Sequence, residues 1–159
     1  MLKTSILCLC LALVLTNCKT KPTENPAMQD ASALIFGKYH GFCQGDCARL
    51  YKITDNQIFA DQVKQLLEPD SLVFSSTPMS EKAYQAAERL LADFPQELMK
   101  EAEEVIGCPD CADQGGYYLE WRSGDVTRRW RLDTNQGALP AYLSAYTKRI
   151  ESVLQSLSK

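Results

Sequence analysis

Short stretches rich in apolar and β-prone residues recur after residue 33, separated by polar and turn-forming residues, which is the pattern of strands. Such stretches occupy residues 34–39, 48–53 and 72–74. Asp55 and Asn56 separate the second stretch from Ile58, which predicts a tight hairpin at that point. The first part of the folded region is therefore expected to be antiparallel sheet.

A longer hairpin is predicted near the middle of the chain, and its register follows from the pattern. Apolar residues alternate with polar ones on both arms: Tyr117, Leu119 and Trp121 on the first, Val126, Trp130 and Leu132 on the second. A two-residue turn at Gly124 and Asp125 pairs Leu119 with Trp130, and Tyr117 with Leu132. The same turn pairs Glu120 with Arg129 on the opposite face. A slip of one residue sets apolar side chains against charges, so the pattern selects this register.

Arg128 shares the apolar face of this hairpin, opposite Trp121. One interpretation is a guanidinium stacked on the Trp121 indole at the margin of the sheet. The other is a residue that reads an anion in a pocket. Stacking is the preferred expectation, because such cation–π pairs are common.

Two stretches have helical spacing instead. Ser80 is placed to cap the first helix, which Pro95 interrupts. Its apolar residues are Ala83, Ala87, Leu90, Leu91 and Phe94. Pro140 fits the first turn of the second helix, whose apolar stripe is Leu139, Leu143, Tyr146, Ile150, Val153, Leu154 and Leu157. That stripe suits a partner helix or a membrane, but we expect it to cover the domain's own sheet.

The pattern as a whole predicts an α+β fold: a mainly antiparallel sheet with two packing helices, bridged by disulfides. Residues 33–159 are enough for one domain with its own core and too few for two. Residues 18–32 are mostly polar and include Pro22 and Pro26, so we expect a flexible tether there.

Residues 1–17 have the features of a signal peptide. Lys3 precedes an apolar run that ends near Leu15, and this run is too short to remain as a membrane span. The sequence from Leu15 to Cys18 resembles the lipobox of bacterial lipoproteins, although Asn17 stands where that family usually has Gly, Ala or Ser. The resemblance implies cleavage before Cys18 and attachment of fatty acids, including palmitate, to that residue. Several acyl chains hold a protein firmly to a membrane.

The net charge of the domain and its expected location limit the partners that it can have. Removal of residues 1–17 takes away Lys3 and no acid, so the formal charge changes from −3 to −4. A mildly acidic domain has no electrostatic reason to bind nucleic acid. Lys19 follows the lipidation site, where lipoproteins retained in the inner membrane can have an acidic residue. We therefore expect a lipid anchor in the outer membrane, with the periplasmic and surface faces both open.

Four cysteines fall within the expected domain: Cys43, Cys47, Cys108 and Cys111. An even number in an oxidising compartment favours disulfides, with three possible connectivities. Links between the two segments are the preferred expectation over local pairs, because closing loops of about sixty residues contributes about 4 kcal/mol for the first link. Cys18 is expected to be consumed by lipid.

Two other readings of these four cysteines stay open. Their thiolates can ligate structural zinc, with His40 replacing one of them. His40 alone is expected to be a solvated or packed imidazole near a turn. The tetrad from Cys108 to Cys111 resembles the active site of thioredoxin-like oxidoreductases, but such a site needs a helix that begins at its first cysteine. The residues from 112 to 116 predict a loop that leads into a strand instead.

We expect a non-catalytic binding or structural module of the bacterial envelope, anchored to a membrane by lipid and interacting with an envelope protein or another ligand. No catalytic residue and no cofactor are predicted: a single histidine disfavours a hydrolytic triad, and the chain has no phosphate loop. The alternative is a thiol-redox or zinc-binding protein that uses Cys43, Cys47, Cys108 and Cys111.

The lipobox, the Cys-x-Gly-x-Cys-like segment around Cys43 and the sequence CPDCADQGG from Cys108 occur together with a terminal amphipathic helix. This combination resembles small uncharacterised bacterial lipoproteins. The resemblance implies an extracytoplasmic address and a similar fold over most of residues 34–157. It implies no activity.

Overall fold

The computed structural model describes residues 33–62, 65–66 and 69–158. The predicted signal peptide of residues 1–17, Cys18 and the tether of residues 18–32 lie outside the described residues, so these expectations stay predictions. Within the described part of the chain, no helix combines the length and the apolar character needed to cross a bilayer.

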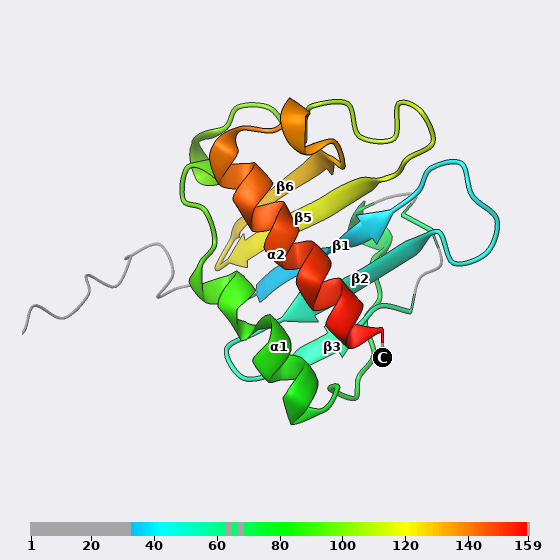
Figure 1. The fold of residues 1–159 in the computed structure, drawn as a ribbon. Coiled ribbons are helices and arrows are strands. Elements are labelled where there is room, and N and C mark those ends of the chain that lie inside the picture. The colour runs from blue at the N-terminus through cyan, green and yellow to red at the C-terminus, as the bar shows by residue number, and fades with distance from the viewer. Residues whose placement is uncertain (1–32, 63–64, 67–68, 159) are drawn as a thin grey trace, which may run out of the picture.

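The described residues form an α+β fold in which two helices lie on one face of a six-stranded sheet (Figure 1). The strands are β1 (Ala33–Tyr39), β2 (Ala48–Ile53), β3 (Ile58–Ala60), β4 (Val105–Ile106), β5 (Gly116–Ser123) and β6 (Val126–Asp133). Their order across the sheet is β3-β2-β1-β5-β6-β4. All neighbours are antiparallel except β4 and β6, which are parallel. The predicted fold class is confirmed.

The β5–β6 hairpin has the register that the sequence predicts. Leu119 pairs with Trp130, and Glu120 pairs with Arg129. Glu120 is completely buried, and the Arg129 Nε atom donates a hydrogen bond of 3.0 Å to it. The Tyr118 hydroxyl also donates to this carboxylate. A buried carboxylate needs such donors, so this cluster fixes the face of the hairpin that points away from the helices.

The predicted strand at residues 72–74 is wrong. Only an isolated bridge between Asp61 and Phe74 forms there. Phe74 and Leu72 instead pack on the sheet face opposite the helices, against a small cluster that includes Leu50 and Tyr118. Their apolar character therefore reflects a covering segment and not a strand within the sheet.

The first predicted helix is confirmed as α1 (Glu81–Ala92). The Ser80 side chain accepts a hydrogen bond of 3.3 Å from the Ala83 backbone N–H, which satisfies one of the free donors of the first turn. Shorter 3-10 helices occur at Pro69–Ser71, Leu98–Lys100 and Gln136–Ala138.

The second predicted helix is α2 (Ala141–Leu157), and its apolar stripe belongs to the domain's own core as expected. The buried stripe residues within the helix are Leu143, Tyr146, Ile150, Val153 and Leu154. Phe94 packs between the helices and the sheet, with ring centroids 4.6 Å from Trp121 and 5.9 Å from Tyr146. Because the Tyr146 hydroxyl donates to the Leu90 carbonyl at 2.7 Å, the same residue also connects α2 to α1.

Arg128 makes a cation–π contact, but not with the expected ring. Its guanidinium lies 5.4 Å from the centroid of Trp130, on the same face two residues along β6. It also donates to the backbone carbonyls of Met99 and Glu101. The prediction of Trp121 as the stacking partner is therefore wrong, because these carbonyls draw the guanidinium toward the segment after α1.

We predict that Ile150→Asp lowers the free energy of unfolding by roughly 3–5 kcal/mol, because it places an unpaired charge in a fully buried position of α2. Ser152→Asp adds the same charge at an exposed position of the same helix and serves as the matched control. Urea unfolding followed by circular dichroism measures both. Equal stability of the two variants would contradict the assignment of this stripe to the core.

Candidate functional site

The described cysteines form two local disulfides, Cys43 with Cys47 and Cys108 with Cys111. The Cα atoms are 5.5 Å apart in each pair. The preferred expectation of links between the two segments is therefore wrong. Each short ring stabilises the domain by about 2 kcal/mol in the chain-entropy account, compared with about 4 kcal/mol for a long cross-link. Another interaction must hold the two segments together.

Both disulfide loops lie at the same end of the sheet, on the right in Figure 1. Residues 40–47 connect β1 to β2, and residues 107–115 connect β4 to β5. Because β1 and β5 are antiparallel neighbours, the last residue of β1, Tyr39, pairs with the first residue of β5, Gly116. We refer to residues 40–47 and 107–115 as the stapled end.

The Asp110 carboxylate joins the two loops. Its Oδ2 atom accepts a hydrogen bond of 2.7 Å from the Gly41 N–H, and its Oδ1 atom accepts one of 2.9 Å from the Gly115 N–H. A Cβ atom on Gly41 would lie 2.2 Å from Oδ2, so a larger residue there would displace the carboxylate. Gly115 has a φ of +72° and lies against the Tyr39 carbonyl, which also leaves no space for a side chain.

Asp110 has a backbone φ of +61°, which is rare for a residue other than glycine. It follows Pro109 in a turn between the two cysteines, where the Cys111 N–H approaches the Cys108 carbonyl at 3.4 Å. Proline followed by a residue of positive φ is the arrangement of a type II turn. Aspartate tolerates this conformation better than most residues, and here its two hydrogen bonds compensate for the cost.

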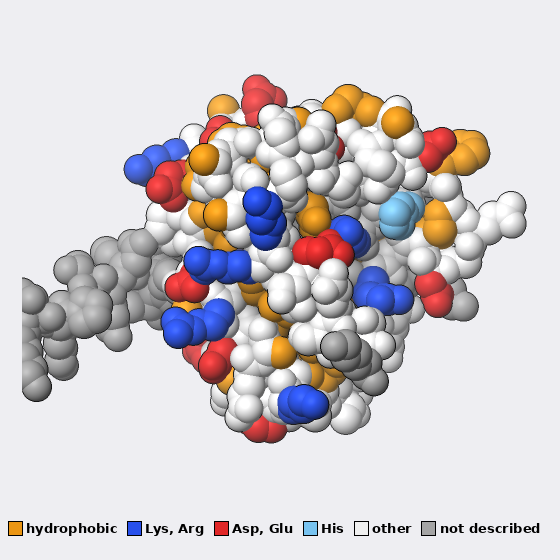
Figure 2. Space-filling view, viewed as in Figure 1, with side chains coloured by type: hydrophobic (Ala, Val, Ile, Leu, Met, Phe, Trp, Pro, Cys, Tyr) orange, Lys and Arg blue, Asp and Glu red, His pale blue; other side chains and the backbone are white. Residues whose placement is uncertain are grey.

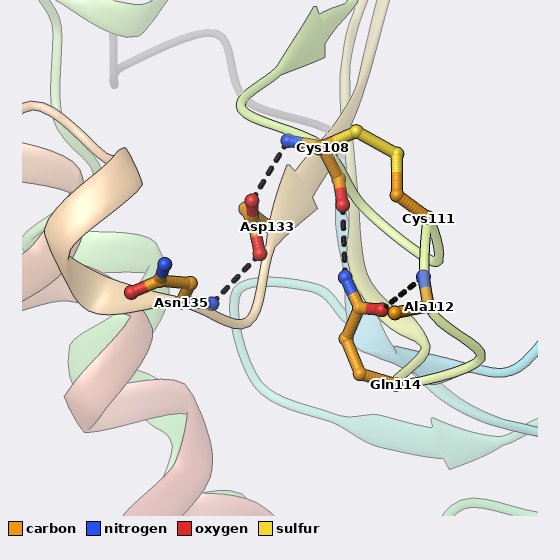
Figure 3. The surroundings of a disulfide bond; sticks show 6 residues. All are labelled: Cys108, Cys111, Ala112, Gln114, Asp133 and Asn135. Atoms are coloured by element: carbon orange, nitrogen blue, oxygen red, sulfur yellow. Dashed lines mark hydrogen bonds between the residues drawn. A yellow bond between two sulfur atoms is a disulfide. The ribbon is translucent and has the colours of Figure 1, made fainter.

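Side chains outside the disulfide hold the rest of the second loop, as Figure 3 shows. The Asp133 carboxylate accepts hydrogen bonds of 2.8 Å from the backbone N–H groups of Cys108 and Asn135. The Gln114 amide donates to the Cys108 carbonyl at 2.9 Å and accepts from the Ala112 N–H at 2.7 Å. The loop backbone is therefore fixed by bonds in which no sulfur atom takes part.

The surroundings of Cys108 differ from those of a thioredoxin-like site. The residues after Cys111 form turns and lead into β5, so within the described residues no helix begins at this tetrad. The expectation of a loop leading to a strand is confirmed. The described helices therefore supply no N-terminal dipole at the Cys108 sulfur.

His40 lies at the end of β1 and is exposed. Its backbone N–H donates to the Cys47 carbonyl at 2.7 Å, and its imidazole packs over Gly115. The sulfur atoms near it are bonded in pairs, whereas zinc binds thiolates. Among the residues that the structure describes, no group of three or more His, Cys, Asp and Glu side chains is placed to hold a metal ion.

A cleft of about 270 Å³ lies beside the first loop, between β1, β2 and the C-terminal half of α2. Lys38, His40 and Arg49 line it together with Glu151. Figure 2 shows this face of the molecule, with the pale-blue histidine beside basic and acidic side chains. The mixture of charges and apolar surface suits the binding of a polar ligand or chain segment.

Lys38 and Glu151 form the central contact of this cleft. The Lys38 Nζ atom is 2.6 Å from Glu151 Oε2, and the Tyr117 hydroxyl donates to the same oxygen at 3.1 Å. The hydrogen bond from Lys38 holds the pKa of the Glu151 carboxyl below its ordinary value. Burial, reinforced by the Glu151 charge, raises the pKa of Tyr117. Sequence reasoning missed this pair, whose only signal is a lysine on the otherwise apolar face of β1.

Phe42 is the second feature that sequence reasoning missed. Its side chain is 88% exposed, although it lies between Gly41, which Asp110 holds, and Cys43, which the disulfide holds. An aromatic ring on a fixed loop loses little conformational freedom when it binds a partner. Exposed aromatic residues are also enriched among the residues that dominate binding energy at interfaces.

Comparison with known proteins adds no family to this description. No protein-family model matches the chain, and no curated protein matches it.

We predict that Asp110→Ala lowers the free energy of unfolding by about 3 kcal/mol, because two backbone donors lose a charged acceptor. Asp110→Asn keeps one acceptor oxygen and is expected to lose about half as much. Asp113→Ala is the matched control, since Asp113 has a similar φ of +57° and is exposed. Thermal unfolding of the three variants gives the comparison. If Asp113→Ala is as destabilising as Asp110→Ala, the carboxylate bridge has no special role.

Proposed function

We propose that this chain is a membrane-anchored extracytoplasmic lipoprotein, and that its domain is a non-catalytic binding module of the bacterial envelope. The lipobox-like sequence that ends at Cys18 supports the anchor. The pairing of all four cysteines of the described domain supports an oxidising compartment, because disulfides persist there and are rare in the cytosol. The anchor belongs in the outer membrane in this proposal, since the residue directly after Cys18 is Lys19 and not an acidic residue.

The single observation that carries the binding role is the exposure of Phe42 on a fixed loop. A large apolar side chain left in water costs free energy that burial against a partner recovers. Val126, another exposed apolar residue of the described chain, lies beside the β5–β6 turn at the other end of the sheet. Phe42 and the cleft beside it therefore form the binding surface of this proposal, with the aromatic ring as the anchor and the cleft as the polar part.

The first strand separates the start of the described domain from the binding surface. The tether leads into β1 at Ala33, whereas the stapled end follows Tyr39 at the other end of that strand. A strand of this length spans about 20 Å. The binding surface therefore lies at the opposite end of β1 from the residue where the described chain begins.

We predict that Cys18→Ser abolishes incorporation of labelled palmitate and releases the domain from the membrane fraction, because the serine hydroxyl cannot be modified by the lipidation pathway that the lipobox implies. Metabolic labelling followed by fractionation measures both. Cys8→Ser is the control, since this cysteine lies within the predicted signal peptide and its loss should change neither readout. Label that persists in Cys18→Ser would contradict the anchor.

We predict that a photo-reactive phenylalanine analogue at position 42 gives a discrete crosslinked product in intact cells, since this side chain is expected to contact the partner. The same analogue at position 126 is the control: Val126 is 53% exposed and lies next to the β5–β6 turn, at the other end of the sheet. A second substitution, Lys38→Glu, should weaken the product at position 42 by reversing a charge in the cleft. Equal crosslinking at positions 42 and 126, or none at either, would contradict binding at the stapled end.

A further inference from the structure

The two disulfides of the stapled end differ in their access to solvent. Cys47 is 2% exposed and Cys43 is half-buried, whereas Cys108 and Cys111 are both exposed. In thiol–disulfide exchange a thiolate must reach a sulfur atom of the disulfide. Access therefore makes the Cys108–Cys111 bond the more reactive of the two.

The loop around the exposed disulfide does not depend on it for its shape. Asp133 accepts a hydrogen bond from the Cys108 N–H, and Gln114 donates one to the Cys108 carbonyl (Figure 3). Asp110 accepts hydrogen bonds from Gly115 and from Gly41 of the neighbouring loop. None of these hydrogen bonds involves a sulfur atom, so we expect them to remain when the sulfur–sulfur bond is broken. Both thiols then stay close together in a turn that is already folded, which favours closure of the same bond again.

The Cys108–Cys111 bond also closes only a short ring, a property that it shares with the Cys43–Cys47 bond. Its cysteines are three residues apart, so the bond restricts the unfolded chain much less than a link between distant segments would. Breaking and re-forming it should leave the fold intact. Accessibility, a preformed turn and a small structural contribution are together the properties of a disulfide that can be exchanged reversibly.

We propose that Cys108 and Cys111 form a thiol–disulfide exchange site that reacts with a dithiol of another protein, while the Cys43–Cys47 bond remains structural. No helix begins at Cys108 in the described part of the chain, so this site does not activate its own sulfur in the manner of thioredoxin. The partner supplies the reactive thiolate. The chain is therefore the substrate of the exchange and not its catalyst.

The reaction proceeds in two steps. A partner thiolate attacks one sulfur atom of the Cys108–Cys111 bond, which forms a mixed disulfide and releases the other cysteine as a thiolate. The second thiol of the partner, as a thiolate, then attacks the mixed disulfide, which releases the remaining cysteine and leaves the partner with a disulfide. Two electrons and two protons pass from the partner dithiol to Cys108 and Cys111. The reverse reaction with an oxidised partner restores the bond.

The first test treats the full chain, purified in detergent, with dithiothreitol as the dithiol. Samples are alkylated at intervals, and mass spectrometry of peptides reports each cysteine separately. We expect Cys108 and Cys111 to become alkylated at least about tenfold faster than Cys43 and Cys47, because solvent access differs. The circular dichroism spectrum should stay native during this phase. Reduction of both pairs at one rate, or unfolding when Cys108 and Cys111 are reduced, would overturn the proposal.

A second test asks whether the preformed turn speeds closure of the Cys108–Cys111 bond, or whether this bond is only more accessible to solvent. Glutathione disulfide is added to the reduced protein, and closure of each pair is followed. Gln114→Ala, which removes two bonds that hold the second loop, should slow closure of the Cys108–Cys111 pair several-fold and leave the Cys43–Cys47 pair unchanged. Unchanged closure in this variant would overturn the role of the preformed turn.

The third test is made in cells, with acid quenching before alkylation. The proposal requires both the reduced and the oxidised form of the Cys108–Cys111 pair, with only the oxidised form of the Cys43–Cys47 pair. Complete oxidation of both pairs under reducing and oxidising growth conditions alike would overturn the proposal, while crosslinking through position 42 would be unaffected.

Discussion

The Asp110 carboxylate is the interaction on which the stapled end depends. It is the point where a turn between two cysteines contacts the loop that carries the other two. Two short disulfides could not connect these loops, because each closes only its own ring. The Gly41 N–H belongs to the first loop and the Gly115 N–H to the second, so this carboxylate connects the two loops beside the paired ends of β1 and β5. Gly41 and Gly115 leave the space that this arrangement needs.

The fold explains why this interaction is possible. Pairing of β1 with β5 in the middle of the sheet brings Tyr39 beside Gly116, and the two loops continue from these residues on the same side. The helices cover one face of the sheet, so α2 ends beside the first loop and contributes Glu151 to the cleft. The proposed binding surface and the exposed disulfide therefore lie on neighbouring loops at the same end of the sheet. Binding at Phe42 would bring a partner close to Cys108 and Cys111, which links the two proposals in space while each remains separately testable.

Much of the fold was predictable because each of these elements is determined by a pattern in its own stretch of sequence. The β5–β6 register follows from alternation that admits a single pairing, and α1 begins where Ser80 provides a cap. Strand β4 was not predicted, because its two residues, Val105 and Ile106, have no pattern of their own and add to the sheet beside β6. The covering segment at residues 72–74 was mistaken for a strand for a related reason, since apolar residues look alike in a strand and in a segment that packs on a sheet.

The site was less predictable than the fold, because long-range contacts determine it. Disulfide connectivity cannot be read from spacing, and the entropy argument for long cross-links omitted the Asp110 bridge that makes them unnecessary. Peptide mapping without reduction tests this account most directly. Trypsin cleaves after Lys38, Arg49, Lys100 and Arg122, so residues 39–49 carry one cysteine pair and residues 101–122 carry the other. The account predicts two separate peptides, each with an internal disulfide. A single product in which the two peptides are joined through sulfur would contradict it.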